Sequence, residues 1–185
     1  EVLPRRNYYF SAYARTRALV SGSGATTAVI GVRPDGTTRE LNYAEHGFNG
    51  TRDWTRLEAN FNSLDCVRVR CYVGVWGGRS GTAWFDRAEV REIALVNLLR
   101  REGAPLTVTS KDKSATYKEG VDYAPVTDPK LGMQPYAGNY DKYHAPPPLR
   151  ILPSGAIRRG DTLLVSFYHP VVIYEYQVGY CVSEE

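Results

Sequence analysis

The sequence lacks a strong excess of either charge. Its 185 residues carry 23 lysines and arginines against 20 aspartates and glutamates, which gives a formal net charge of +3. Domains that bind nucleic acids usually carry a concentrated basic excess that neutralises phosphates. We therefore do not expect DNA or RNA as a partner.

Long hydrophobic runs are also absent. No apolar stretch approaches the roughly 18 residues that a membrane-spanning helix needs, and no secretory signal peptide is recognisable. We expect a soluble protein without a membrane partner. Because the sequence starts at Glu1 and directly at a strand-like stretch, it is typical of a processed or excised piece of a longer, extracellular protein.

Cysteine is scarce, since only Cys66, Cys71 and Cys181 are present. Three cysteines fit neither a disulfide-dense scaffold nor a zinc site, whose ligands typically come in close pairs. An odd spacing places Cys66 and Cys71 on opposite faces of a strand, so they should not pair with each other. Cys181 could bridge to either one, but buried free thiols are the interpretation that we favour.

Tyrosine and the turn-forming residues are abundant by contrast. The chain has 14 tyrosines, 17 glycines and 11 prolines but only one methionine. This balance favours short strands joined by turns over long helices. A tyrosine ring is flat and apolar with a polar tip, so tyrosine is also common at binding surfaces.

Alternation of apolar and polar residues predicts the individual strands. In the first of these, residues 7–15, one face carries Tyr8, Phe10, Ala12 and Ala14, which we expect in the core. The further predicted strands are residues 26–32, 39–43, 53–61, 67–75, 82–86, 106–110, 117–123, 149–152, 162–168 and 171–182. By spacing alone, residues 90–101 could be a short helix or a strand, and we favour a strand followed by a linker. An all-β sandwich explains this pattern best.

The strand over residues 67–75 has two contrasting faces. One face is apolar and carries Val67, Val69, Cys71, Val73 and Val75. The opposite face carries Arg68, Arg70, Tyr72, Gly74 and, just beyond the strand, Trp76. That second face is too polar for a core and too aromatic for an ordinary solvated surface.

Residues 67–74, the small-residue turn after them and residues 80–86 together resemble the closing strands of jelly-roll carbohydrate-binding modules. These are galactose-binding-like sandwiches of the group that includes families 4, 9, 16 and 22. A P-x-x-x-Y-x-x-S strand that starts at Pro4, the Asp53-Trp54-Thr55 segment and Phe61 agree with the group in their order. The resemblance implies a jelly-roll domain over residues 1–102, followed by an accessory β-region over residues 103–185.

Modules of this group usually open with an Asn-Pro-x-Phe-Glu strand, which this sequence lacks. Either the missing strands lie in another part of the parent protein, or the sandwich is completed differently. In relatives, the aspartate matching Asp86 helps to bind a structural calcium together with the opening-strand glutamate. The resemblance thus implies calcium at Asp86. Because the glutamate strand is absent, a turn-capping role for Asp86 is the alternative, and a second departure is Arg87, where the family often has another aspartate.

The later segments 117–123 and 160–168 resemble the accessory β-modules that precede catalytic barrels in large glycoside hydrolases. The implied partner is a neighbouring catalytic domain of the same parent protein.

A binding platform follows if the tyrosine strand and the 67–75 strand lie in one sheet. Aromatic rings stack on pyranose faces, and arginines donate to hydroxyls or carboxylates, so several arginines favour an acidic sugar. The candidate residues are Tyr9, Tyr13, Arg15, Arg68, Arg70, Tyr72 and Trp76. The alternative is that the second half of the chain covers this face, with the tyrosines packed and the arginines in salt bridges.

Catalytic constellations are not evident. The sequence has no G-x-S-x-G, phosphate-binding loop or HExxH motif. We expect the Glu89–Glu92 and Glu119–Asp122 pairs to be solvated rather than to act as acid and base. His46, His144 and His169 lack metal-type spacing and should have surface or capping roles. Trp84 should lie in the core, and Trp54 should pack.

The sequence therefore predicts a non-catalytic carbohydrate-binding module of an extracellular enzyme that degrades a plant or algal-type polysaccharide. The alternative is a structural β-module that positions the neighbouring catalytic domain without binding glycan.

Overall fold

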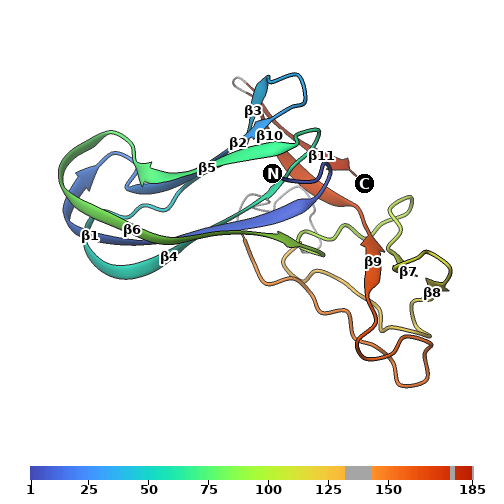
Figure 1. Ribbon diagram of the computed structural model, residues 1–185. Coiled ribbons are helices and arrows are strands. Elements are labelled where there is room, and N and C mark those ends of the chain that lie inside the picture. Colours follow the sequence, from blue (N-terminus) through green and yellow to red (C-terminus); the bar gives the residue numbers. More distant parts are fainter. Residues whose placement is uncertain (132–142, 176–177, 185) are drawn as a thin grey trace. The chain divides into compact units, whose positions relative to one another are not determined.

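The computed structural model describes residues 1–131, 143–175 and 178–184, with only the backbone described after Pro170. Eleven strands, β1 to β11, are assigned in this part of the chain (Figure 1). The described residues hold no helix, and hence none able to span a membrane. The prediction of an all-β sandwich is confirmed.

The chain divides into two compact units. The larger contains Glu1–Ile93 together with Val171–Val182, and the smaller contains most of the described residues between them. The first boundary thus falls after Ile93 rather than at residue 102, and the C-terminal segment returns to the larger unit. The sixth strand ends at Ile93, because Leu95 and Asn97 adopt left-handed backbone conformations with φ of 64° and 59°.

Two sheets form the larger unit. The three-stranded sheet has the order β4-β1-β6, and the five-stranded sheet has the order β11-β10-β3-β2-β5. These strands are β1 (Asn7–Ser21), β2 (Ala25–Val32), β3 (Thr38–Glu45), β4 (Gly50–Asn62), β5 (Arg68–Val75), β6 (Gly78–Ile93), β10 (His169–Glu175) and β11 (Val178–Glu184).

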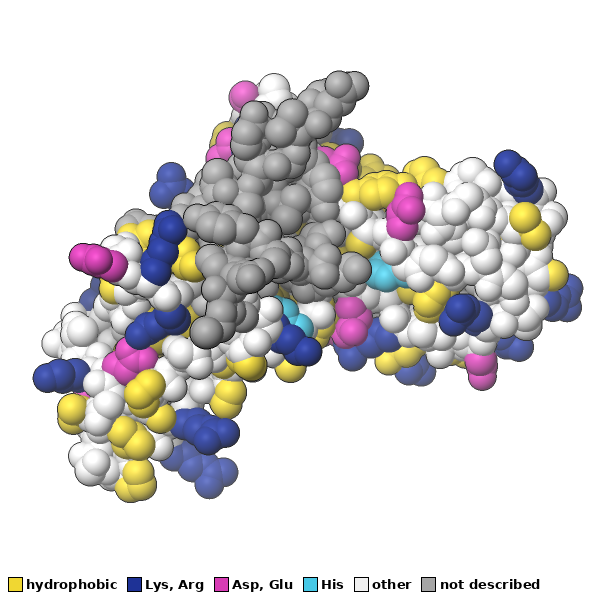
Figure 2. Space-filling model, turned by 180° about the vertical axis from the view of Figure 1, so that it is seen from behind, with side chains coloured by type: hydrophobic (Ala, Val, Ile, Leu, Met, Phe, Trp, Pro, Cys, Tyr) yellow, Lys and Arg dark blue, Asp and Glu magenta, His cyan; other side chains and the backbone are white. Residues whose placement is uncertain are grey.

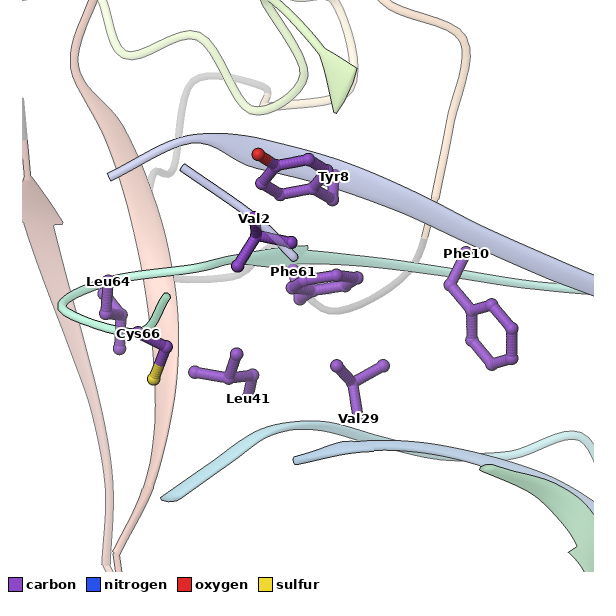
Figure 3. Close-up of a cluster of buried hydrophobic side chains, with 8 residues drawn as sticks. All are labelled: Val2, Tyr8, Phe10, Val29, Leu41, Phe61, Leu64 and Cys66. Atoms are coloured by element: carbon purple, nitrogen blue, oxygen red, sulfur yellow. The ribbon is translucent and has the colours of Figure 1, made fainter. Parts of the chain in front are cut away.

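The main core of this unit lies between the two sheets. Figure 3 shows Phe10 and Phe61 on one side of it and Val29 and Leu41 on the other. Tyr8 stacks on Phe61 with 5.6 Å between ring centroids. All four residues predicted on the core face of β1 are buried. Each large apolar side chain buried here stabilises the fold by about 1.5–3 kcal/mol.

Within β5, the alternation of the two predicted faces is confirmed, but Val67 lies before the strand and is 37% exposed. Val69, Cys71 and Val73 pack against the core, while the residues between them point outward. Cys66 and Cys71 are free thiols, and burial raises the pKa of Cys71 to about 11. The side chain of Cys181 lies outside the described residues.

The C-terminal segment completes the five-stranded sheet. β10 pairs with β3 through Tyr174 and Glu40, and β11 lies beyond β10. Of the two expectations for the missing opening strand, this arrangement agrees with a sandwich that is completed differently. The narrower expectation of a jelly-roll strand order stays a prediction.

The smaller unit has a three-stranded sheet of its own, in the order β8-β7-β9. Its strands are β7 (Thr107–Ser110), β8 (Thr116–Tyr117) and β9 (Leu163–Ser166). Val108 and Tyr123 are buried at the centre of its core. The carboxylate of Asp122 accepts hydrogen bonds of 2.7 Å from the backbone amides of Lys118 and Ala156, which fixes two loops around this core.

Candidate functional site

The premise of one shared platform is wrong. β1 belongs to the three-stranded sheet and β5 to the five-stranded sheet, and both turn their apolar faces to the core between the sheets. Their outer faces therefore point away from each other. Alternation reveals which residues of a strand share a face, but it does not reveal which strands are neighbours. The seven candidate residues thus divide into two sets.

In the first set, Tyr9 is a packing residue, with 0% of its surface exposed. Its hydroxyl donates a hydrogen bond of 2.6 Å to Glu58, and the ring of Tyr143 packs against it with centroids 4.3 Å apart. The guanidinium of Arg91 lies 4.5 Å from the ring centroid. Burial, reinforced by the bond to Glu58, raises the pKa of Tyr9 to about 12. Tyr9 cannot stack on a sugar.

Two arginines beside Tyr9 form salt bridges, although neither belongs to the predicted platform. Arg56 lies 3.7 Å from Glu89, and Arg91 lies 3.4 Å from the same carboxylate. Arg56 also lies over Tyr13, 5.9 Å from its ring centroid, so that this half-buried tyrosine is partly covered. This end of the outer face is therefore a network of packed rings and ion pairs.

Arg15, the third residue of the first set, is exposed. Its Nε atom lies 3.9 Å from Asp53, and its guanidinium lies 5.6 Å from the ring centroid of Trp84. Arg15 and Trp84 are opposite each other in the β1–β6 ladder, on the outer face of the sheet.

Trp54 and Trp84 are 44% and 41% exposed, so the expectations of packing for Trp54 and of a core position for Trp84 are wrong. Neighbouring residues of a strand point to opposite faces. Phe85 packs against the core, and this position forces Trp84 outward.

The second set lies on the outer face of the five-stranded sheet. Arg68 and Arg70 are exposed, and Tyr72 and Trp76 retain 43% and 39% of their surface. Trp76 folds back over Gly74, as the short distance between them shows. A Cβ atom at Gly74 would lie 3.3 Å from the indole Cζ3 atom of Trp76. All four predicted residues of this set therefore lie at the surface of one face.

Sequence reasoning missed Tyr43, which joins this face from β3. Its ring meets the indole of Trp76 edge-on, with centroids 6.4 Å apart. Tyr43 and Tyr72 are both paired with Ala28 of β2, from its two sides. Neighbouring strands lie about 4.8 Å apart, so the backbones of the two tyrosines lie about 10 Å apart, with the small Ala28 side chain between them. Only the strand order could have revealed this neighbourhood.

Asp86 has a backbone role in the structure. Its carboxylate accepts a hydrogen bond of 2.8 Å from the amide of Arg87, whose φ of 51° is left-handed. The β1–β6 ladder shifts register at this point, so Asp86 supports a β-bulge. The part of the chain that the structure describes holds no group of three His, Cys, Asp or Glu that could bind a metal. Calcium at Asp86 stays a prediction.

The carboxylates considered as an acid and base pair have structural partners. Glu89 bonds the two arginines beside Tyr9, and Glu119 forms a 2.5 Å ion pair with Arg100. Glu92 lies 3.6 Å from Arg6. Asp122 is buried on backbone amides rather than solvated, because it fixes loops of the smaller unit.

The histidines have separate surroundings. His46 lies 3.0 Å from Thr27, and His144 lies 2.7 Å from the buried Asp128. His169 is buried, and burial lowers its pKa to about 4, so the expected surface role is wrong for this residue. It precedes Pro170 inside β10, and Pro170 is buried as well.

Figure 2 shows lysine and arginine side chains at separate points on the visible surface of each unit. This distribution agrees with the nearly balanced charge of the sequence. Comparisons of the chain with protein-family models, curated proteins and solved structures found no match.

Proposed function

We propose that the outer face of the five-stranded sheet binds a polysaccharide, and that the chain is a non-catalytic module of an extracellular polysaccharide-degrading enzyme. One observation carries this proposal. Trp76 and Tyr72 remain substantially exposed on a sheet face where Tyr43 lies beside them. The resemblance of residues 67–74 and 80–86 to carbohydrate-binding modules supports the same function.

Exposed aromatic rings suit sugar recognition for a physical reason. One side of a pyranose ring presents mainly C–H groups, and stacking removes apolar surface from water at about 25 cal/mol per Å². Tyrosine and tryptophan lose little conformational entropy on binding, and their polar atoms can still bond sugar hydroxyls. Three such rings on one sheet thus provide a surface for several units of a sugar chain.

The backbone holds these rings in position. Gly74 leaves room for the indole of Trp76 beside the strand, and Tyr72 is fixed by a strand paired along its whole length with β2. A site on paired strands is more rigid than a site on loops. Arg70 lies two positions before Tyr72, on the same face of β5. Its guanidinium can donate there to sugar hydroxyls or carboxylates.

A structural module that positions a neighbouring catalytic domain is the second candidate. The burial of Tyr9 beneath Tyr143 favours it, because this residue of the predicted platform serves packing. The pairing of β10 with β3 favours it too, since the C-terminal segment is built into the sandwich. The two candidates differ in whether Trp76 and Tyr72 contact a ligand.

Affinity gel electrophoresis separates these candidates. The protein would be run through gels that contain plant or algal polysaccharides, beside the variants Trp76→Ala and Tyr72→Ala. Trp54→Ala is the matched control, because it removes an exposed tryptophan from the other sheet. We expect at least one polymer to retard the wild type and the control but not the two variants. Unretarded wild type on every polymer would support the structural module.

A further inference from the structure

The three-stranded sheet contains a hollow of about 450 Å³ that is separate from the aromatic surface of the other sheet. All three strands line it. Arg15 and Arg17 come from β1, Arg52 and Asp53 from β4, and Trp84 from β6. None of these residues takes part in the proposed surface around Trp76.

The hollow lies where the backbone of β1 is irregular. The register of β1 shifts against β6 between Arg17 and Val20, and against β4 between Thr16 and Leu19. Ala18, inside both intervals, has a left-handed φ of 48°. β-Bulges of this kind bend a strand and redirect its side chains, and they are frequent beside binding sites. The hollow is therefore a feature of the backbone as well as of its side chains.

Gly81 fixes this irregular backbone from β6. Its φ is 99°, and a Cβ atom there would lie 2.4 Å from the carbonyl oxygen of Ala18. Only glycine allows the two strands to approach this closely. The close approach keeps the bulge of β1 in place beside Trp84.

The charges around the hollow are not balanced. Three guanidiniums face one carboxylate, that of Asp53, which is exposed and lies 3.9 Å from Arg15. In the described part of the chain, neither Arg17 nor Arg52 forms an ion pair. Arg52 is held over the ring of Phe48, 5.0 Å from its centroid. The local field therefore favours an anion.

We infer that this hollow binds an anionic group of a charged saccharide, either a carboxylate or a sulfate ester. The planar guanidiniums of Arg17 and Arg52 match the oxygens of such groups. The exposed indole of Trp84 provides an apolar wall for the sugar ring that carries the charge. This inference does not depend on the surface around Trp76, which lies in the other sheet.

Three polymers with the same backbone test the inference: neutral dextran, carboxymethyl dextran and dextran sulfate. Affinity electrophoresis would compare wild type with Arg17→Gln and Trp84→Ala. Arg79→Gln is the control, since it removes the same charge from an exposed arginine elsewhere on β6. Each charge-assisted contact changes affinity by about tenfold or more. We expect both variants to bind the charged polymers at least about tenfold more weakly than wild type, and the control to change little. Wild type should prefer one or both charged polymers over neutral dextran.

Several outcomes would overturn the inference. Equal weakening of Arg79→Gln and Arg17→Gln would show nonspecific attraction by net charge. If Trp84→Ala is retarded like wild type, the indole does not contact the sugar ring. If neither charged polymer retards the wild type, the hollow does not bind anionic saccharides. Thermal unfolding of each variant controls for loss of folding. Arg17→Gln and Trp84→Ala leave Tyr72 and Trp76 in place, so failure of this site is distinguishable from failure of the proposed polysaccharide surface.

Discussion

The hydroxyl of Tyr9 donates a hydrogen bond of 2.6 Å to Glu58, which lies diagonally across the β1–β4 ladder. This bond, together with the ring of Tyr143, converts a tyrosine on an outward-facing position into a fully buried residue. This residue of the predicted sugar platform is thus part of the fold. Sugar binding in the larger unit must then use other residues.

Replacing Tyr9 with phenylalanine should separate folding from binding. The ring stays, but the carboxylate of Glu58 loses its donor, so we expect the free energy of unfolding to fall by about 1–3 kcal/mol. Urea denaturation measures this change. Polysaccharide retardation should stay at the wild-type level, and a variant that folds normally but loses retardation would return Tyr9 to the binding site.

Stability at high pH should also depend on Tyr9. Its pKa rises to about 12 in the folded protein, mainly through burial, whereas the unfolded chain titrates near 10. The unfolded state therefore releases its proton first, so the contribution of Tyr9 is complete below pH 10 and is lost as the pH rises towards 12. The unfolding free energy of the wild type should fall more steeply in this window than that of Tyr9→Phe. Parallel curves would contradict the burial of Tyr9.

Gly81→Ala should destabilise the larger unit strongly. A side chain at φ 99° is strained, and its Cβ atom would meet the backbone of Ala18 at 2.4 Å, so we expect a loss of about 2 kcal/mol or more. Gly22→Ala is the matched control, because a Cβ atom at Gly22 meets nothing within 4 Å. Thermal unfolding should show a lower midpoint for Gly81→Ala alone. Equal midpoints would mean that the bulge adapts freely.

If Asp86 binds calcium, the ion should change the thermal unfolding midpoint. Calcium should raise the unfolding midpoint of the wild type after treatment with a chelator, because an ion bound only to the folded state stabilises it. Asp86→Asn should lose this response, since it removes the charge but keeps an oxygen for the Arg87 amide. An unchanged wild-type midpoint would leave Asp86 with the bulge-supporting role alone.

Most strands and their faces were predictable, because each depends on residues close in sequence. Residues 117–123 and 149–152 were also predicted as strands, but only β8 and isolated bridges at Tyr123 and Ile151 form there. Alternation placed Tyr8 and Phe10 in the core and separated the two faces of β5 correctly. The neighbours of each strand were not predictable in this way, since they depend on contacts between distant residues. Tyr43 reaches Trp76 across β2, and Tyr143 covers Tyr9 from far along the chain. A sugar platform requires those contacts.

Titration calorimetry with the polysaccharide identified by the gel screen tests the binding role of the five-stranded sheet most directly. Wild type and Trp54→Ala should bind it with the same Kd. Trp76→Ala should bind at least about tenfold more weakly, because a central aromatic contact typically contributes more than 1 kcal/mol. A folded Trp76→Ala protein that binds with the wild-type Kd would contradict the proposed surface.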